Sequence, residues 1–593
     1  MCGVFAFTSS NKQNPTLVLE GLKRLEYRGY DSWGIAVLSD NTLEMKKNTG
    51  PLNLQTVSHQ IKNLPESNLG LGHIRWATHG KVNVTNAHPH TSLNNDMALV
   101  HNGIVENYEE LKKVVKKQNL SIKTETDSEI IMRLIEIELK KTNTLAKALA
   151  NAFKHLKGRN TIILITNKGE LVGIKNGSPL VIGINDDGYY FGSDTLSFGQ
   201  KTKKALILDN FEMAYFNNKN LEIYNINSLV NVKKSPILLN QTYNYSEKSG
   251  YKHYMLKEIY EQSKAIVEAT SYSKKELTSF TEQIKESENI YTIGAGTASY
   301  AAGQIAFYLR EYAGIKAIEL KAYEIESYKK IFTKKDLVIA ASQSGESADT
   351  IEALEIAKNN KAKIASIVNM QGSTISRMSD FPFYLKAGPE ICVLSTKSYT
   401  SKLSWGYIVA KHISKQYEQA QKNIVEVAES IEKYLSDKNN LTQIKNLAKK
   451  LIKVEHAFVL GRGQNFYTAL ETALKVKEVS YKHFEAFSAG ELKHGVIALV
   501  ENNTPVICHV SEDDEKANML SAAQEVKARG AVTIQVGNIK SDIFDYSLSV
   551  PESRELAGIA NIIPIQLLSY YMAALQNLDP DKPRNLAKSV TVK

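Results

Sequence analysis

The spacing of hydrophobic and polar positions differs between the first 240 residues and the rest of the chain. In the first region, short apolar runs such as residues 161–166 are bounded by Gly, Asn, Asp or Lys, a pattern typical of strands and turns. Apolar residues at helical spacing predict helices at residues 16–25, 108–117 and 128–140. We therefore expect an α+β domain over residues 2–240, with stacked sheets and flanking helices.

A polar stretch rich in Tyr and Asn follows, at about residues 225–251, and indicates a linker. A helix is predicted from about His253 to Thr270. We place the linker together with this connecting helix at residues 241–280.

Alternating strands and helices then occur twice. Strands are predicted at residues 289–293, 336–341 and 363–368, and again at 456–460, 505–510 and 532–536. The Gly-x-Gly turns that follow the first strand of each copy, at Gly294 and Gly461, are 167 residues apart. This repeat predicts two α/β doubly wound domains at residues 281–425 and 440–580, followed by a tail at 581–593. Ligands of such sheets bind beyond the carboxyl ends of the strands.

The Gly-x-Gly turns do not indicate a dinucleotide site. The fingerprint of such a site requires a third Gly, and the corresponding positions hold Ser299 and Phe466.

Composition narrows the class of protein. The chain has 593 residues, of which 43% are hydrophobic and 23% charged, and this amino-acid composition is typical of a multidomain globular protein. The net charge of +10 comes from dispersed lysines without a dense Arg patch, so we expect no nucleic-acid partner. Three cysteines cannot form a closed disulfide framework, which favours the reducing cytoplasm. No stretch approaches 18 apolar residues, so we expect no membrane association.

Cys2 is a candidate nucleophile. If Met1 is removed, Cys2 carries both a thiol and an α-amine, whose ordinary pKa of about 7.7–8.0 leaves part of it as neutral base at pH 7. A nucleophile beside its own amine needs no separate histidine. An accidental Cys at position 2 is the competing interpretation, and other motifs decide between the two.

Several polar motifs accompany Cys2 in this region. They are Cys2-Gly3, Arg28-Gly29-Tyr30-Asp31-Ser32, Arg75-Trp76-Ala77-Thr78-His79-Gly80, His101-Asn102-Gly103 and Thr126-Asp127. An Asn amide next to a Gly N–H is typical of an oxyanion hole. Together these motifs resemble the class II glutamine amidotransferase domain, which has an N-terminal-nucleophile fold.

This resemblance implies roles for the motif residues. Cys2 attacks the side-chain amide of L-glutamine, and Asn102 and Gly103 stabilise the oxyanion. Arg75 holds the α-carboxylate of glutamine and Asp127 its α-ammonium group, while Trp76 gates the released ammonia. Thr78 and His79 complete the predicted glutamine site.

The loop after the second strand of the first repeat, Ser342-Gln343-Ser344-Gly345-Glu346-Ser347, predicts a phosphate site. Hydroxyls, backbone N–H groups and a helix N-terminus together attract an anion, although Ser before a helix is also a common N-cap. The same place in the second repeat reads Ser511-Glu512-Asp513-Asp514-Glu515, and four acids repel phosphate. We therefore expect one phosphate site, in the first repeat.

The second repeat and the tail carry other candidates. Glu471, Lys475 and Glu478 lie on one helix face, which by itself is equally typical of a surface charge stripe. His494 follows in Gly490–Gly495, and Lys588 lies in the polar tail. Together with Ser342–Ser347 and Ser395-Thr396-Lys397, this set resembles the paired sugar isomerase (SIS) domains of the glutamine–fructose-6-phosphate aminotransferase family.

The second resemblance implies a sugar-phosphate site. Its implied contacts to the sugar phosphate and hydroxyls are Thr297, Ser342, Gln343, Ser344, Ser347 and Ser395. Lys588 forms a Schiff base with the open-chain ketose, and Glu478 moves a proton between C1 and C2. His494, reaching over from a second subunit, assists ring opening, and Lys475 supports the charge. Trp33, Ala298 and Val496 depart from the residues usual in the family.

The two resemblances together imply an enzyme that converts L-glutamine and D-fructose 6-phosphate to L-glutamate and D-glucosamine 6-phosphate. Neither a thiolate nor a lysine Schiff base requires a metal or an organic cofactor, so we expect none. We expect at least a homodimer. An amidotransferase acting on another keto-sugar phosphate and a non-catalytic sugar-phosphate-sensing SIS protein are the alternatives.

Overall fold

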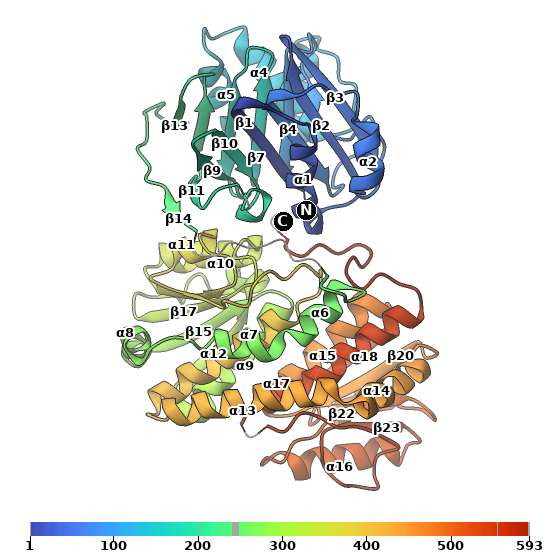
Figure 1. Cartoon of the computed structure of the whole chain (residues 1–593). Coiled ribbons are helices and arrows are strands. Elements are labelled where there is room, and N and C mark those ends of the chain that lie inside the picture. Colours follow the sequence, from blue (N-terminus) through green and yellow to red (C-terminus); the bar gives the residue numbers. More distant parts are fainter. Residues whose placement is uncertain (1, 200, 240–247, 554, 591–593) are drawn as a thin grey trace. The chain divides into compact units, whose positions relative to one another are not determined.

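The computed structural model describes residues 2–199, 201–239, 248–553 and 555–590. It divides the chain into two units (Figure 1). Unit 1 comprises Met1–Ser246 with Ser589–Lys593, and unit 2 comprises Glu247–Lys588.

Unit 1 contains two antiparallel sheets. The eight-stranded sheet has the order β14-β11-β9-β10-β1-β4-β2-β3, and the six-stranded sheet has the order β13-β12-β8-β7-β6-β5. The strands of the first sheet are β1 (Gly3–Gln13), β2 (Ser32–Ser39), β3 (Thr42–Thr49), β4 (Ser67–Arg75), β9 (Val181–Asn185), β10 (Gly188–Gly192), β11 (Lys204–Ile207) and β14 (Ile237–Leu238). Those of the second are β5 (His90–Thr91), β6 (Met97–Gly103), β7 (Asn160–Thr166), β8 (Leu171–Asn176), β12 (Glu212–Phe216) and β13 (Leu221–Asn225).

Apolar side chains arrange unit 1 in four layers. One core joins the facing sides of the two sheets, with Val4 and Leu71 from the first and Val100 and Ile163 from the second. A second core packs α1 (Thr16–Arg24) and α2 (Leu54–Gln60) on the eight-stranded sheet. A third packs α3 (Tyr108–Lys117), α4 (Asp127–Leu139) and α5 (Leu145–Lys154) on the six-stranded sheet. The predicted stacked sheets with flanking helices are confirmed.

The predicted linker at residues 225–251 is wrong in part, because Ile237–Leu238 forms edge strand β14. Its Leu238 pairs with Lys204 of β11. Main-chain pairing holds this strand while its side chains stay exposed, 70% for Leu238, so no hydrophobic alternation marks it. Residues 240–247 of the predicted linker lie outside the described residues.

Unit 2 contains two five-stranded parallel sheets of the same design. Their orders are β16-β15-β17-β18-β19 and β21-β20-β22-β23-β24. The first consists of β15 (Asn289–Gly294), β16 (Ala317–Lys321), β17 (Asp336–Ala341), β18 (Lys363–Val368) and β19 (Phe381–Tyr384). The second consists of β20 (His456–Gly461), β21 (His483–Ser488), β22 (Pro505–His509), β23 (Val532–Val536) and β24 (Tyr546–Leu548). The predicted pair of doubly wound domains is confirmed.

One large apolar core unites both sheets of unit 2. Among the helices that build it are α9 (Thr297–Ala313), α12 (Lys397–Ile413), α13 (Tyr417–Ser436), α14 (Lys438–Leu451), α15 (Asn465–Ser480) and α18 (Ile562–Leu575). The remaining helices include α8 (Lys274–Glu286), α10 (Ala348–Asn359), α11 (Thr374–Met378), α16 (Lys516–Lys527) and α17 (Ala557–Ala560). The predicted helix at residues 253–270 is two helices, α6 (Tyr254–Tyr260) and α7 (Gln262–Glu268). They are separated by Glu261, whose ψ of −5° departs from the helical value of about −42°.

Among the described residues, one helical stretch, Ala557–Leu575, has the length and hydropathy to cross a membrane. Its most apolar window is 83% buried in the protein, as is usual for a core helix.

Candidate functional site

Cys2 lies at the start of β1, next to the end of β4. The pairing of Gly3 with Ile74 brings Cys2 to the loop that follows Arg75. The backbone N–H of Trp76 donates to the sulfur at 3.3 Å, and the thiol lies 3.5 Å from the Trp76 carbonyl oxygen. Burial raises the pKa of the Cys2 thiol, against the lowering effects of the Trp76 N–H and the Arg75 charge. A base must therefore take its proton before the sulfur can attack.

The structure brings Arg75 and Asp127 to Cys2. The Arg75 charge lowers the pKa of the Cys2 thiol and the Asp127 charge raises it, so both groups lie close enough to influence the thiol. Asp127 is the first residue of α4, and its carboxylate accepts a hydrogen bond from the Val105 N–H at 2.9 Å. Arg75 is buried and donates to the carbonyl oxygens of His79, Gly80 and Lys81, the last at 3.2 Å. These bonds fix the loop after β4 to the predicted carboxylate-binding group.

Asn102 and Gly103 end strand β6. The Asn102 amide donates to the Ser193 hydroxyl at 3.0 Å, and this hydroxyl also accepts the Val4 N–H at 2.9 Å. Through Ser193, the predicted oxyanion group is thus tied to the strand that begins after Cys2. Gly103 has a φ of +143°, and a Cβ there would lie 2.2 Å from the Arg159 carbonyl oxygen, so only Gly fits.

The other predicted glutamine-site residues lie on the loop after β4. The Trp76 ring stands edge-on to Tyr30 with centroids 5.7 Å apart, Thr78 is exposed, and the half-buried His79 ring lies 5.7 Å from Tyr108. The carboxylate of Asp31 accepts the Ala77 N–H at 2.8 Å. Sequence reasoning noted the motif around Asp31 but missed this loop-holding role.

A buried histidine cluster beneath this site was also missed. His73 and His88 stack at 4.0 Å, and Ser128 Oγ lies 2.8 Å from His88 Nε2 and 2.9 Å from His101 Nδ1. Burial lowers the pKa of His73, His88 and His101, so the rings are neutral at pH 7. No regular spacing connects these residues in the sequence, so the sequence carries no signal for their assembly.

In unit 2, the predicted phosphate loop follows β17 and leads into α10. The Ser342 hydroxyl accepts the Gly345 N–H at 3.0 Å, and that of Ser344 accepts the Glu346 N–H at 3.1 Å, which closes the loop on itself. Gln343 is half-buried. Ser347 occupies the N-cap position of α10, but its side chain makes no capping hydrogen bond. The simple N-cap interpretation therefore does not account for Ser347.

In the matching loop of the second repeat, acidic side chains pair with other side chains of the protein. Glu515 pairs with Arg462 at 2.5 Å, Glu512 with Lys516 at 2.6 Å, and Asp513 accepts from Gln464 at 3.1 Å. The acids of this loop are thus partly compensated by neighbouring side chains, and the expectation of one phosphate site, in the first repeat, stays a prediction.

Helix α15 carries a buried charge cluster rather than a surface stripe. Lys475 Nζ lies 2.5 Å from Glu478 and 3.4 Å from Glu471, and its side chain is 1% exposed. Burial raises the pKa of Glu471 to about 7 although Lys475 opposes this. The Thr297 hydroxyl, predicted to contact the sugar phosphate, donates to Glu471 at 3.2 Å.

The side chain of the tail residue Lys588 is buried, and its ammonium group lies 2.6 Å from the carboxylate of Glu390. Ser395 Oγ lies 2.6 Å from Ser398 Oγ, which in turn donates to Glu390 at 2.7 Å. The sequence analysis missed Glu390, since one acid five positions before Ser395 forms no recognisable motif.

Lys402 of α12 connects these groups. Burial lowers the pKa of Lys402 to about 8; the charges of Lys588 and Lys475 also lower it, whereas the carboxylates of Glu390 and Glu471 raise it. The charges of the predicted Schiff-base lysine and of the α15 cluster therefore both act on the pKa of Lys402. His494 is exposed and ends the short helical turn Leu492–His494, whose first residue is buried.

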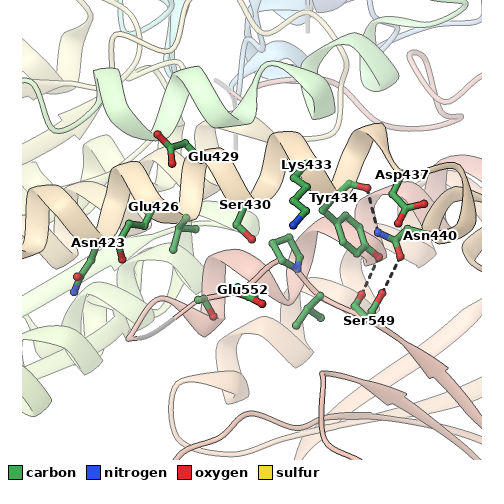
Figure 2. A pocket seen from close by; sticks show the side chains of 14 residues that line it. Asn423, Glu426, Glu429, Ser430, Lys433, Tyr434, Asp437, Asn440, Ser549 and Glu552 are labelled. Atoms are coloured by element: carbon green, nitrogen blue, oxygen red, sulfur yellow. Dashed lines mark hydrogen bonds between the residues drawn. The ribbon is translucent and has the colours of Figure 1, made fainter.

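A separate cavity of about 590 Å³ lies between α13 and residues 549–553 (Figure 2). Its lining includes Glu426, Glu429, Lys433 and Asp437, and none of the predicted site residues. It is therefore distinct from the predicted sugar site.

Two family models match the chain. The model described as glutamine amidotransferases class-II matches residues 1–185, and that described as SIS domain matches residues 283–412 and 450–576.

Relatives match over the full length. The chain is 38% identical to the glutamine–fructose-6-phosphate aminotransferase [isomerizing] of Pyrococcus horikoshii and of Thermococcus kodakarensis, and 37% identical to that of Aquifex aeolicus, with 100% of each chain covered. A solved structure, the C-terminal domain of glucosamine-fructose-6-phosphate aminotransferase from Francisella tularensis, matches with 33% identity and a TM-score of 0.53, covering 57% of this chain and 100% of that one. The chain therefore belongs to the glutamine–fructose-6-phosphate aminotransferase (isomerizing) family.

Proposed function

We propose that this enzyme transfers the amide nitrogen of L-glutamine to D-fructose 6-phosphate and isomerises the product to D-glucosamine 6-phosphate. The observation that carries the proposal is the buried tail amine of Lys588 in contact with Glu390, in a chain that matches this family from end to end. An exclusively sugar-sensing protein does not account for the Cys2 site.

In unit 1, the Cys2 sulfur attacks the side-chain amide carbon of glutamine. With Met1 removed, the α-amine of Cys2 takes the thiol proton and returns it to the leaving ammonia. Asn102 and the Gly103 N–H stabilise the oxyanion, and water then hydrolyses the thioester to glutamate. Arg75 and Asp127 bind the α-carboxylate and α-ammonium of glutamine, flanked by Trp76, Thr78 and His79.

In unit 2, the loop of Ser342, Gln343, Ser344 and Ser347 binds the phosphate, and Thr297 and Ser395 contact the sugar. Lys588 forms an imine at the ketose C2, and ammonia replaces Lys588 at this carbon. Glu478 then removes a proton from C1 and returns it to C2, which converts the ketimine into the amino aldose. Lys475 offsets the negative charge that develops during this transfer.

We further propose a cytoplasmic homodimer. The three cysteines are unpaired thiols, which suits a reducing compartment. The exposed position of His494 supports its use in the partner's sugar site.

The test supplies amide-15N glutamine with fructose 6-phosphate and follows the sugar product by mass spectrometry. We expect 15N in glucosamine 6-phosphate, and intact-protein mass spectrometry should show Met1 removed. Cys2→Ala should stop transfer from glutamine, and Lys588→Ala should stop amino-sugar formation while glutamine hydrolysis continues. Glutamate without labelled amino sugar would refute the proposed acceptor.

A further inference from the structure

Lys588 has a fixed counter-ion in Glu390. The ammonium group lies 2.6 Å from the Glu390 carboxylate and 3.4 Å from the Leu394 carbonyl oxygen. Only 2% of the Lys588 side chain and none of the Glu390 side chain is exposed. An unpaired ammonium in such a place is strongly disfavoured, so the pair holds Lys588 charged and in one position.

The Glu390 carboxylate is itself held by several donors. One oxygen accepts the N–H groups of Thr396 at 2.9 Å and Ser398 at 3.0 Å. The other accepts from the Ser398 hydroxyl at 2.7 Å and from Lys588 at 2.6 Å. Although burial acts against the ionised form, Lys588 and these donors lower the pKa of Glu390 to about 2. In the absence of sugar, Glu390 is therefore a carboxylate beside an ammonium.

Other titratable groups face this pair. Burial and the Glu390 charge raise the pKa of Glu258 on α6 to about 8, so this carboxyl is mostly neutral at pH 7. Lys402 on α12 donates to the Ser398 carbonyl oxygen at 2.9 Å. Lys397 lies nearby and has its own partner, Glu261, at 2.6 Å. Among these groups, Glu390 is the carboxylate that directly contacts the amine of Lys588.

An ammonium group has no lone pair for attack on a carbonyl, so Lys588 must lose a proton before it can form an imine. The side chain that contacts Lys588 Nζ and can accept its proton is the carboxylate of Glu390. Proton transfer within a buried ion pair yields two neutral groups, and enclosure by a bound sugar favours that neutral state.

We propose that Glu390 is the proton acceptor and counter-ion of Lys588 in imine formation, an inference that rests on the proposed function. Glu390 takes one proton from the ammonium, and the amine nitrogen bonds to the ketose carbon while one of its two remaining protons passes to the ketose oxygen. Glu390 then gives the proton to the carbinol oxygen, which leaves as water. The nitrogen ends as an iminium with one positive charge, and Glu390 is a carboxylate again.

This proposal predicts a distinctive pH profile. At rest, Lys588 is an ammonium and Glu390 a carboxylate. In the reactive state, Lys588 is an amine and Glu390 a neutral carboxyl. The two states contain the same number of protons. Imine formation by the wild type should therefore vary little between about pH 5 and 7, below the pKa of about 8 of both Glu258 and Lys402. In Glu390→Gln the proton must go to solvent, so the rate should rise with pH across this range.

The measurement traps the imine with cyanoborohydride in the presence of fructose 6-phosphate and counts modified Lys588 by peptide mass spectrometry. At pH 7 we expect Glu390→Gln to lose about 100-fold or more in trapping rate, the usual contribution of a proton acceptor. Glu390→Asp should recover most of this rate and keep the flat profile. Glu261→Gln, which removes the partner of Lys397, is the matched control and should behave as wild type.

The outcomes separate the two proposals. If the wild type shows no sugar-dependent modification of Lys588, the proposed Schiff base fails. If the wild type is modified and Glu390→Gln has the same flat profile, at full or reduced rate, Glu390 is not the proton acceptor. Thermal unfolding of each variant, compared with wild type, shows whether unit 2 has folded.

Discussion

At the residue scale, the backbone φ angle and the free space around Cα decide which residues can replace Gly103. Gly103 and Gly50 both have positive φ, +143° and +88°. A Cβ on Gly50 meets no atom within 4 Å, whereas a Cβ on Gly103 meets a backbone oxygen at 2.2 Å. The two positions therefore separate the cost of the φ angle from the cost of a steric clash.

We expect Gly50→Ala to cost about 1–2 kcal/mol, the usual penalty for a side chain at positive φ. Gly103→Ala should cost at least about twice as much, because the Arg159 carbonyl must also move, and the displaced oxyanion group should abolish glutamine hydrolysis. Thermal unfolding and glutaminase assays of both variants check this. Equal melting temperatures with retained hydrolysis in Gly103→Ala would contradict it.

Sequence reasoning at this scale succeeds where chemistry and spacing coincide. Glu471, Lys475 and Glu478 were predicted to share a face because helical geometry requires it, and the structure places them in contact. Glu390 could not be predicted in the same way. Its partner Lys588 is 198 positions away, and an ion pair of this kind depends on tertiary packing rather than on local pattern.

At the element scale, the short helix α6 joins two segments of the proposed sugar site. Asp581 of the tail accepts the first N–H groups of the helix, from Tyr254 at 2.9 Å and Met255 at 2.8 Å. One turn later, Glu258 accepts the N–H of Cys392 at 3.1 Å. The helix thus links the tail that carries Lys588 to the segment that carries Glu390.

The buried carboxyl of Glu258 makes the stability of this arrangement depend on pH. Its folded-state pKa of about 8 lies above its ordinary value of 4.5, so the folded protein holds a proton that the unfolded chain loses. Stability therefore falls as pH rises from about 4.5 to 8, by roughly 3–5 kcal/mol for this group.

Glu258→Gln should remove this effect, since the amide keeps a carbonyl acceptor for the Cys392 N–H and does not ionise. We expect the melting temperature of the variant, relative to wild type, to rise between about pH 5 and 8. Thermal unfolding across this range measures the difference. Parallel curves for the two proteins would show that Glu258 does not carry the pH dependence.

Pattern recognition predicted elements well where one face is buried or where strand and helix alternate. The central strands β17, β18 and β23 have the expected bounds. Strand β14 was missed because its side chains are exposed and only main-chain pairing holds it. Helix α12 is not predicted by hydrophobic periodicity. Nearly every one of its residues is buried, so it lacks the polar face that produces an alternation of apolar and polar positions.

At the scale of the whole molecule, the order of domains could be read from the sequence, while the sugar site could not be assembled from it. The proposed sugar site draws on α9, the loop after β17, the segment around Glu390, α15 and the tail. Parallel sheets bring loops to one edge, but the sequence does not fix which side chains then meet. A contribution from a second subunit depends on how two chains assemble, which the sequence pattern likewise does not determine.

Mixing two inactive variants tests that assembly. If His494 acts in the partner's sugar site, a heterodimer of His494→Ala with Lys588→Ala contains one complete site, formed by Lys588 of one chain and His494 of the other. With random reassociation half of the dimers are mixed, so about a quarter of wild-type synthase activity should return. The mixture must be unfolded and refolded together, and each variant treated alone is the control. If His494 serves its own chain, every site in the mixture lacks one of the two residues, and no activity returns.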